Sequence, residues 1–235
     1  MQKQKMLSSV RERILAAQDA AEVRESPDTL ALALTKGSDG NKVFFDRSAV
    51  HFTGRSRIVI EGEGNYVFFA GSGKINSSRI EIKGNNSIIY IGDNLNFDGN
   101  KILIAGDEAL ISIGRDFRAN FGTELLAKEN NAEILIGDDC LFSTNIGIRT
   151  SDNHGIFDLA TRERINFARD VHILDRVWIG EDAKVLKGVS IGPDAIVGAA
   201  AIVTKDVPSF CAVGGNPAKV VKQNIFWYKH FKLPK

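Results

Sequence analysis

The stretch that decides the fold runs from Ile173 to Val207, I-L-D-R-V-W-I-G-E-D-A-K-V-L-K-G-V-S-I-G-P-D-A-I-V-G-A-A-A-I-V-T-K-D-V. An aliphatic β-branched residue returns every six positions in it, and a second, mostly small residue follows each one after four: first Ile173, Ile179, Val185, Ile191, Val197 and Val203, then Val177, Ala183, Val189, Ala195, Ala201 and Val207. An α-helix would spread a period of six around its circumference, whereas a chain that coils through three short strands keeps every such residue inward. The stretch therefore predicts a parallel β-helix of hexapeptide repeats, in which each coil rests on its neighbours. Gly180, Gly192 and Gly198 each follow an inward aliphatic residue and fit corners where a side chain would crowd the turn.

The upstream half repeats with a longer period. Ile60, Ile82, Ile104 and Leu126 are spaced by 22 positions, and the series Phe69, Ile91, Ile113 and Ile136 is spaced by 22, 22 and 23. We interpret each unit as one coil of three hexapeptides with about four extra residues in one Gly- and Asn-rich corner. An ordinary β-sandwich is the alternative fold, but sandwiches do not hold a fixed period over such a length.

The repeat divides the chain into three parts. Residues 1–40 are expected to form an N-terminal helical segment: an amphipathic helix over 3–24, with Met6, Leu7, Val10, Ile14 and Leu15 on one face, and a second short helical piece over 28–34. The all-β domain is expected over 41–207, with a loop insertion at about 150–170 that is long enough to suggest a functional role. The tail, 208–235, is expected to form a short helix that caps or crosses the last coils. Its aromatic and basic residues favour packing on the solenoid or on a neighbouring subunit over peripheral contact with a membrane.

Composition narrows the class of protein further. A chain of 235 residues, 43% hydrophobic and 25% charged, fits one main domain, and a formal net charge of +1 gives no overall attraction to nucleic acid. Two cysteines, Cys140 and Cys211, form neither a disulfide framework nor a metal-binding spacing, which argues against a redox role. The N-terminus is charged where a signal peptide needs an apolar run, and no segment has the roughly 18 apolar residues of a transmembrane helix. We therefore expect a cytoplasmic protein.

The hexapeptide run occurs together with further motifs: H-G-I-F-D at 154–158, V-W-I-G at 177–180, G-A-A-A-I-V-T-K-D-V-P at 198–208 and G-N-P-A-K-V-V-K at 215–222. With them the chain resembles the hexapeptide-repeat acyltransferases, most of all the galactoside and maltose acetyltransferases and the O-acetyltransferases of bacterial capsules and lipopolysaccharide. The resemblance is dense over 134–222, weaker over 42–133 and absent from 1–40. It implies a left-handed β-helix and a homotrimer with sites between subunits. It also implies transfer of acetyl from acetyl-CoA to a carbohydrate hydroxyl.

The resemblance makes His154 the candidate general base. In that family a histidine at the mouth of a loop is followed at a characteristic interval by the tryptophan of V-W-I-G, and here Trp178 follows His154 by 24 positions. A hydroxyl is a poor nucleophile at neutral pH, and an imidazole with a pKa near 6.5 can accept its proton during direct attack on the thioester. Asp152 could orient the imidazole as triad carboxylates do, although a turn-forming aspartate explains it equally well. A lone histidine near a loop is more often structural, and we expect this of His51, His172 and His230.

The resemblance also implies contacts with the pantetheine arm of coenzyme A. Trp178 is expected to flank that arm, while Gly180 and Ala199 present backbone at positions where the side chain is small.

The far end of coenzyme A carries phosphates, and four residues match the positions at which the family meets that end. Thr204 and Lys205 are expected near the adenine and phosphates, although an ordinary polar corner is the alternative. Lys219 and Lys222 fall where the family often has basic residues. Because lysine is a point charge without the fork of arginine, these two could bind more loosely or not at all.

The acceptor leaves a weaker signal. Asn120, in A-N-F at 119–121, matches the family asparagine that faces the sugar across the subunit boundary. Arg162 and Arg164 in the loop insertion could meet an anionic sugar such as sialic acid, or form a solvated surface.

Three other functions remain as alternatives. N-acetylation of an amino sugar or nucleotide sugar is the main rival, and it uses the same residues. A zinc lyase of the same solenoid type would need three converging imidazoles. The sequence offers only His154 and His172, so we expect no metal. A non-catalytic scaffold would have no reason to keep the pair of His154 and Trp178.

Overall fold

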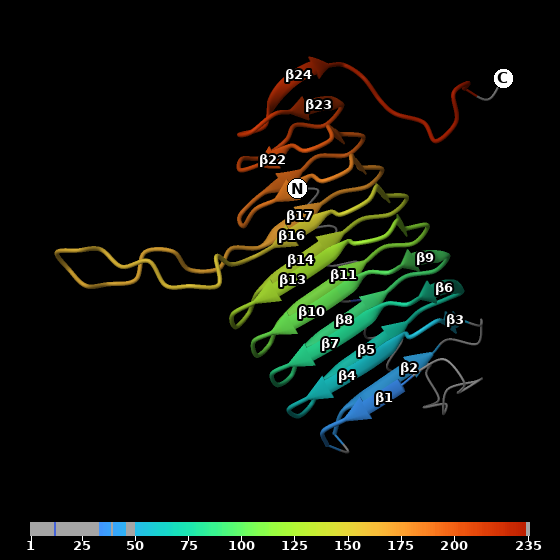
Figure 1. The fold of residues 1–235 in the computed structure, drawn as a ribbon, viewed down its shortest axis with the longest axis vertical. Helices are drawn as coiled ribbons and strands as arrows, with labels where there is room; N and C mark the ends of the chain where they lie inside the picture. Colours follow the sequence, from blue (N-terminus) through green and yellow to red (C-terminus); the bar gives the residue numbers. More distant parts are fainter. Residues whose placement is uncertain (1–11, 13–32, 39, 46–49, 234–235) are drawn as a thin grey trace.

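The computed structural model describes residues 12, 33–38, 40–45 and 50–233, and these residues form a stack of coils with three parallel sheets along its sides (Figure 1). The first sheet contains β1 (Ala33–Lys36), β4 (Arg57–Glu61), β7 (Arg79–Lys83), β10 (Lys101–Ala105), β13 (Glu124–Lys128), β16 (Gly147–Arg149), β19 (Lys184–Val185) and β22 (Ile202–Val203). The second contains β2 (Lys42–Phe45), β5 (Tyr66–Phe69), β8 (Ile88–Ile91), β11 (Leu110–Ile113), β14 (Glu133–Ile136), β17 (Val171–Ile173) and β20 (Ser190–Ile191). The third contains β3 (Val50–Thr53), β6 (Gly73–Asn76), β9 (Leu95–Asp98), β12 (Arg118–Ala119), β15 (Leu141–Phe142), β18 (Trp178–Ile179), β21 (Ile196–Val197), β23 (Cys211–Gly214) and β24 (Lys219–Gln223).

The chain visits the three sheets in turn, so the solenoid has three edges. We call the edge where the chain passes from the first sheet to the second the first edge, and the edge where it returns from the third sheet to the first the third edge. The predicted parallel β-solenoid is confirmed, because each strand pairs in parallel with the strand one coil later up to β23.

The core runs along the axis of the coils. Both predicted series from Ile173 to Val207 are inward and at most 4% exposed. The long-period series Phe69, Ile91, Ile113 and Ile136 is aligned as predicted. The other long-period series contains one error, because Ile104 pairs with Ala127 and not with Leu126. Ala127 is the inward residue, and Leu126 is only half-buried.

The extra residues of the long coils are divided between two edges. Core residues of neighbouring sheets are six positions apart in the short coils, as are Ile173 and Ile179. In the long coils Ile60 and Phe69 are nine positions apart across the first edge. Ile75 and Ile82 are seven apart across the third edge. The prediction of a single enlarged corner was therefore wrong, since three of the four extra residues lie at the first edge and one at the third.

The solenoid extends beyond both predicted boundaries. β1 pairs with β4, so strand begins at Ala33, and the short helix expected over 28–34 is wrong for its last two residues. At the other end β23 adds a further parallel strand and β24 folds back antiparallel to it, where a helix was expected. Residues 208–233 contain no helix. The expected helix over 3–24 lies outside the described residues except for Glu12, which has helical backbone geometry and is exposed.

The helices within the described part of the chain include none that is long and apolar enough to cross a membrane.

Candidate active site

The predicted loop insertion is a hairpin that leaves the solenoid at the first edge, between β16 and β17 (Figure 1). Phe157 and Arg164 form an antiparallel bridge, and the backbone N–H of Ile165 donates to the carbonyl of Ile156 at 2.9 Å. The carboxylate of Asp158 accepts hydrogen bonds from two backbone N–H groups at the turn. The insertion thus enlarges further the edge that already carries extra residues in the earlier coils.

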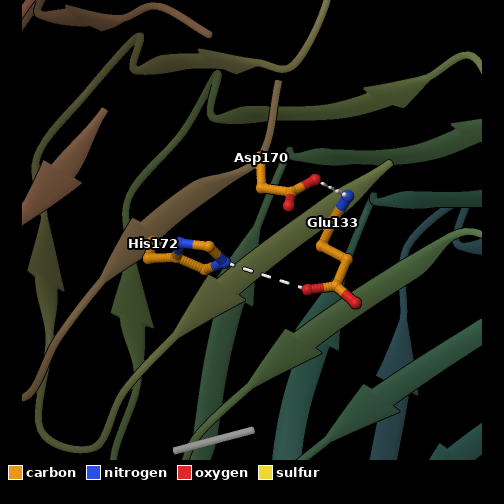
Figure 2. A group of neighbouring side chains, drawn as sticks. All are labelled: Glu133, Asp170 and His172. Carbon is orange, nitrogen blue, oxygen red and sulfur yellow. Dashed lines mark hydrogen bonds and ion pairs between the residues drawn. The ribbon is translucent and has the colours of Figure 1, made fainter. Parts of the chain in front are cut away.

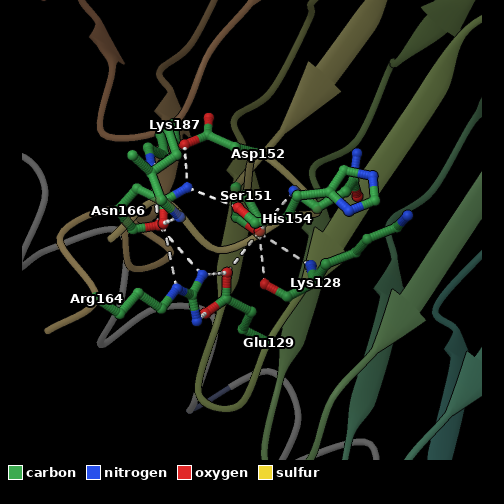
Figure 3. Close-up of polar contacts among 11 residues, drawn as sticks. Lys128, Glu129, Ser151, Asp152, His154, Arg164, Asn166 and Lys187 are labelled. Atoms are coloured by element: carbon green, nitrogen blue, oxygen red, sulfur yellow. Dashed lines mark hydrogen bonds and ion pairs between the residues drawn. The ribbon is translucent and has the colours of Figure 1, made fainter. Parts of the chain in front are cut away.

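A carboxylate from the preceding coil holds the base of the hairpin. Glu129 lies at the first edge just after β13, and Arg164 of the hairpin donates to both of its oxygens, at 2.7 and 2.8 Å (Figure 3). The hydroxyl of Ser151 donates to Glu129 Oε1 at 2.5 Å. Hydrogen bonding from Arg164, and then from Ser151, holds the pKa of Glu129 below its usual value and keeps it charged.

Asn166 ties the two strands of the hairpin together beside His154. Its amide Nδ2 donates to the carbonyl of His154 at 2.8 Å and to Asp152 Oδ2 at 2.9 Å, while its Oδ1 accepts from the N–H of Ile156 at 2.6 Å. The ammonium group of Lys187, from the coil above, donates to the same Asp152 oxygen at 2.5 Å. Lys187 first, and Asn166 second, hold the pKa of Asp152 below its usual value.

These contacts change the role expected for Asp152. Within the described chain no hydrogen bond joins its carboxylate to the imidazole of His154. The carboxylate is occupied by Lys187 and Asn166, so it acts on the His154 backbone through the Asn166 amide. The direct orienting contact predicted from sequence is not formed.

His154 itself is exposed at the start of the hairpin. It follows Asn153, whose φ of 68° lies in the left-handed region that Asn tolerates in turns. No partner for the imidazole occurs among the described residues. The backbone of His154 is therefore fixed while its imidazole is exposed to solvent.

The two arginines of the hairpin differ in their surroundings. Arg164 is committed to Glu129, and its guanidinium also lies 5.0 Å from the ring centre of Phe167, so its expected role in meeting an anionic sugar does not fit the geometry. Arg162 is exposed at the turn. An open hollow of about 500 Å³ lies at the hairpin base and is lined in part by Lys128 and Glu129. Lys128 forms no ion pair with any described residue.

A second group of predicted residues lies at the third edge. Trp178, on β18, is 39% exposed, and Asn120 is exposed just after β12. A Cβ on Gly180 would lie 2.7 Å from the backbone N of Ala199 in the next coil, so a side chain is excluded there by contact between coils. A side chain was expected to crowd the turn at Gly180, and in the structure the crowding atoms belong to the next coil.

The C-terminal tail covers part of Trp178. Trp227 lies with its ring centre 6.2 Å from that of Trp178, and its indole N–H donates to the carbonyl of Arg176 at 2.6 Å. The preference for packing of the tail on the solenoid agrees with this contact.

The remaining cofactor candidates are exposed and widely placed. Thr204 and Lys205 follow β22 at the first edge, and Lys219 and Lys222 lie on β24 of the third sheet. One chain thus divides the predicted site: His154, Thr204 and Lys205 belong to the first edge, and Asn120, Trp178, Gly180 and Ala199 to the third.

One group of described side chains could hold a metal ion. The ligand atoms of Glu133, Asp170 and His172 lie within 4.8 Å of one another on the outer surface of the second sheet (Figure 2). His172 Nε2 is 3.8 Å from Glu133 Oε2, and Asp170 accepts a hydrogen bond from the backbone N–H of Glu133. The group contains one imidazole, whereas the alternative zinc lyase needs three. It does not match that class of enzyme.

Sequence reasoning missed the residues that position the hairpin. Glu129, Ser151, Asn166 and Lys187 come from three coils. The contacts of Glu129 with Ser151 and Arg164, and of Lys187 with Asp152, span 22 or 35 positions and form only because the edges stack. The one signal in the sequence was the insertion itself. Trp227 was noted only as part of an aromatic tail.

The fold defines a class, the parallel β-solenoid proteins, and this member carries an exposed histidine on an edge loop. No family model matches the chain. A polysialic acid O-acetyltransferase of Escherichia coli O1:K1 is 42% identical over 110 residues, which cover 47% of this chain and 36% of that protein. A galactoside O-acetyltransferase of Escherichia coli K12 is 28% identical over 124 residues, covering 51% and 59%. The chain thus spans about a third to three fifths of the length of these curated relatives.

Two solved structures are similar over most of their length. The polySia-specific acetyltransferase NeuO has a TM-score of 0.66 and 30% identity, with 86% of this chain and 91% of that chain covered. The polysialic acid O-acetyltransferase OatWY has a TM-score of 0.61 and 29% identity, with 85% and 93% covered. The chain belongs to the hexapeptide-repeat acyltransferases.

Proposed function

We propose that the protein is an O-acetyltransferase that moves acetyl from acetyl-CoA to a hydroxyl of a polysaccharide containing sialic acid. The observation that carries the proposal is the exposed His154, whose backbone is fixed by Asn166 and whose hairpin is anchored by Glu129. The similarity to two polysialic acid acetyltransferases over most of the chain supports the acceptor class. A cytoplasmic location stays a prediction.

We further propose a left-handed solenoid that assembles as a homotrimer. The division of the site between two edges supports it, since threefold symmetry can bring the first edge of one subunit against the third edge of the next. The hairpin also exposes Ile156, Phe157, Leu159, Ile165 and Phe167, each more than half accessible. An apolar surface of this kind is typical of a protein interface.

In the proposed reaction His154 accepts the proton of the sugar hydroxyl as its oxygen attacks the thioester carbonyl carbon. A C–O bond forms, the C–S bond breaks, and the imidazolium returns the proton to the leaving thiolate. Trp178, Gly180 and Ala199 of the neighbouring subunit would contact the pantetheine arm. Thr204, Lys205, Lys219 and Lys222 offer polar and cationic groups for the phosphates. Asn120 would contact the acceptor.

Lys128 is the cation that we assign to the acceptor carboxylate. It lines the hollow at the hairpin base, and in Figure 3 its side chain extends in the same direction as the imidazole of His154. Arg164, by contrast, is neutralised by Glu129. Lys128→Gln should raise KM for the anionic polysaccharide with little change in the KM for acetyl-CoA, and Lys74→Gln, at an exposed lysine on β6 of the third sheet, is the control. An unchanged KM for the acceptor would remove Lys128 from the site.

The test of the function is acceptor-dependent release of free CoA from acetyl-CoA. The acceptors are a polysialic acid, a neutral polysaccharide and an amino-sugar nucleotide. We expect release with the first, lowered by roughly 10²–10⁴ in His154→Ala, and unchanged in His230→Ala, a histidine of the tail. Release with the amino-sugar nucleotide alone would favour N-acetyl transfer. Equal rates for wild type and His154→Ala would refute the proposed base.

A further inference from the structure

The last described segment of the chain, 224–233, carries one of the protein's two tryptophans, and Trp178 is the other. In Figure 1 this segment, in red, leaves β24 and runs outside the coils. It begins at Asn224, whose φ of 57° lies in the left-handed region that asparagine tolerates. The backbone N–H of Ile225 then donates to the carbonyl of Phe210 at 3.1 Å. The start of the segment is therefore tied to the second edge, where the chain passes from the second sheet to the third.

Side chains of the segment alternate in exposure. Ile225 and Trp227 are half-buried, whereas Phe226 and Tyr228 are exposed. Successive side chains of an extended chain point in opposite directions. The segment thus lies on the solenoid with Ile225 and Trp227 toward the coils.

Trp227 meets Trp178 in a fixed arrangement. Its indole N–H donates to the carbonyl of Arg176 at 2.6 Å, two residues before Trp178. The two ring centres are 6.2 Å apart and the ring planes are tilted by 50°, a separation at which aromatic pairs attract each other. Trp178 keeps 39% of its surface exposed with Trp227 in place. The contact therefore restricts the ring of Trp178 and leaves part of it open to a ligand.

Charge holds the same segment two residues further on. Lys229 lines a hollow of about 400 Å³ at the second edge, together with two arginines and the carboxylates of Asp116, Asp138, Asp139 and Asp175. Both arginines are in ion pairs, Arg115 with Asp138 at 2.9 Å and Arg176 with Asp194 at 2.5 Å. Residues 207–235 contain lysines and no acidic residue. Attraction between Lys229 and this acidic edge favours the position in which Trp227 reaches Trp178.

We infer that Trp227 is a positioning residue of the coenzyme A site, which holds the ring of Trp178 in the orientation that contacts the pantetheine arm. The inference rests on the proposed function, from which it takes the place of Trp178 beside the cofactor. A side chain that is ordered before the ligand arrives loses less conformational freedom on binding than a free one. Trp227 therefore raises the affinity for coenzyme A and leaves the acceptor unaffected.

The test is the Kd for coenzyme A, measured by calorimetry on the full-length protein. Trp227→Ala should raise it roughly 2- to 12-fold, and KM for acetyl-CoA should rise with it while kcat and the KM for the acceptor stay the same. Trp227→Phe keeps a ring but loses the N–H bond, so its Kd should lie between those of wild type and Trp227→Ala. Phe226→Ala, on the exposed side of the same segment, is the control and should bind as wild type does.

Two results of this experiment would overturn the inference. An unchanged Kd in Trp227→Ala would show that Trp178 needs no support. Tighter binding would show that the segment competes with the cofactor. Trp178→Ala, measured in parallel, separates this failure from that of the proposed function: weaker binding in Trp178→Ala alone leaves the proposed site standing. An unchanged Kd in both variants would remove Trp178 from the site and the inference with it.

The pair can also be observed without a ligand. The protein has no other tryptophan, so its indole signals report Trp178 and Trp227 alone. Two indole rings in contact couple and give paired bands of opposite sign in far-ultraviolet circular dichroism. We expect these bands in wild type and in Phe226→Ala, and we expect Trp178→Phe and Trp227→Phe to lose them equally. A wild-type spectrum without the bands would show that the two rings do not meet in solution.

Discussion

The coils before the hairpin and the coils after it have the same connectivity and different cores. The earlier coils contain 22 to 24 residues, and Ile, Leu and Phe fill them, including Phe97, Phe117 and Phe142. The later coils repeat after 18 residues and contain Val, Ala and Ile. A longer perimeter encloses a wider cross-section, which larger side chains must fill, because interiors are close-packed. Residues added at an edge therefore determine the size of the side chains on the axis.

The hairpin lies where the coil length changes, and it belongs to the edge that is enlarged in every earlier coil. Glu129, in the last of those enlarged edges, is the residue that Arg164 of the hairpin grips. The long coils thus provide the wide edge from which the hairpin leaves. They also provide the carboxylate that anchors the hairpin carrying His154. The short coils provide Trp178 at the third edge.

The largest effect is expected from mixing subunits that are inactive for opposite reasons. His154→Ala disables the part of the site on the first edge, and Trp178→Ala disables the part on the third edge. Each variant alone should therefore be nearly inactive. Co-refolded in equal amounts they should recover roughly a quarter of wild-type activity, because only some interfaces of a random trimer are intact. Mixing Asn120→Ala with Trp178→Ala, which damage the same edge, is the control and should recover none. Recovery in neither mixture would place the whole site within one chain.

Removing a ring from the wide core should be the largest stability change. Phe117 is fully buried, and its ring centre is 4.9 Å from that of Phe142. Phe117→Ala should lower the free energy of unfolding by about 3–5 kcal/mol because the neighbouring coils cannot close the cavity. Chemical denaturation measures it. A loss below about 1 kcal/mol would mean that the wide coils collapse readily.

The narrow core of the 18-residue coils should be destabilised by a larger side chain, whereas the wide core is destabilised by a smaller one. Ala195 is fully buried in an 18-residue coil. Ala195→Leu should overpack it and cost about 1–3 kcal/mol, while Ile111→Leu in the wide coils, which conserves volume, should cost less than about 1.5 kcal/mol. If Ala195→Leu is neutral in the same denaturation experiment, the difference in cross-section between the two regions is smaller than we infer.

The smallest effect is local to the junction. Glu129→Gln should loosen the hairpin while the coils stay folded, measured as faster hydrogen exchange at Ile156 and Ile165. Glu163→Gln, at the exposed turn, is the control and should change little.

The same contacts predict a pH dependence. The folded pKa values of Glu129 and Asp152 are lowered from 4.5 and 3.8, so their anchoring is fully present above those values and is lost as pH falls through the lowered ones. Exchange at the hairpin, corrected for its intrinsic pH dependence, should therefore rise only below about pH 4. An increase near neutral pH instead would implicate another group.

The sequence by itself determined the inward residues of the short coils and the position of the loop. A period of six in β-branched and small residues is a local property, and each inward position can be read without knowing its neighbour in space. The family motifs singled out His154 and Trp178 in the same way. The prediction of the inward residues was wrong where the coil length varied. One added residue puts Ala127, and not Leu126, at the inward position that pairs with Ile104.

Only the tertiary structure decided which edge carries each residue and what holds the hairpin. Glu129 and Arg164 are 35 positions apart and meet because the first edges of successive coils stack. The same stacking brings Lys187 to the carboxylate of Asp152 and places the predicted site residues on two different edges. At the C-terminal end, strand β24 forms where a helix was expected. These outcomes depend on which residues of neighbouring coils lie close in space, and the periodicity of the sequence does not contain that information.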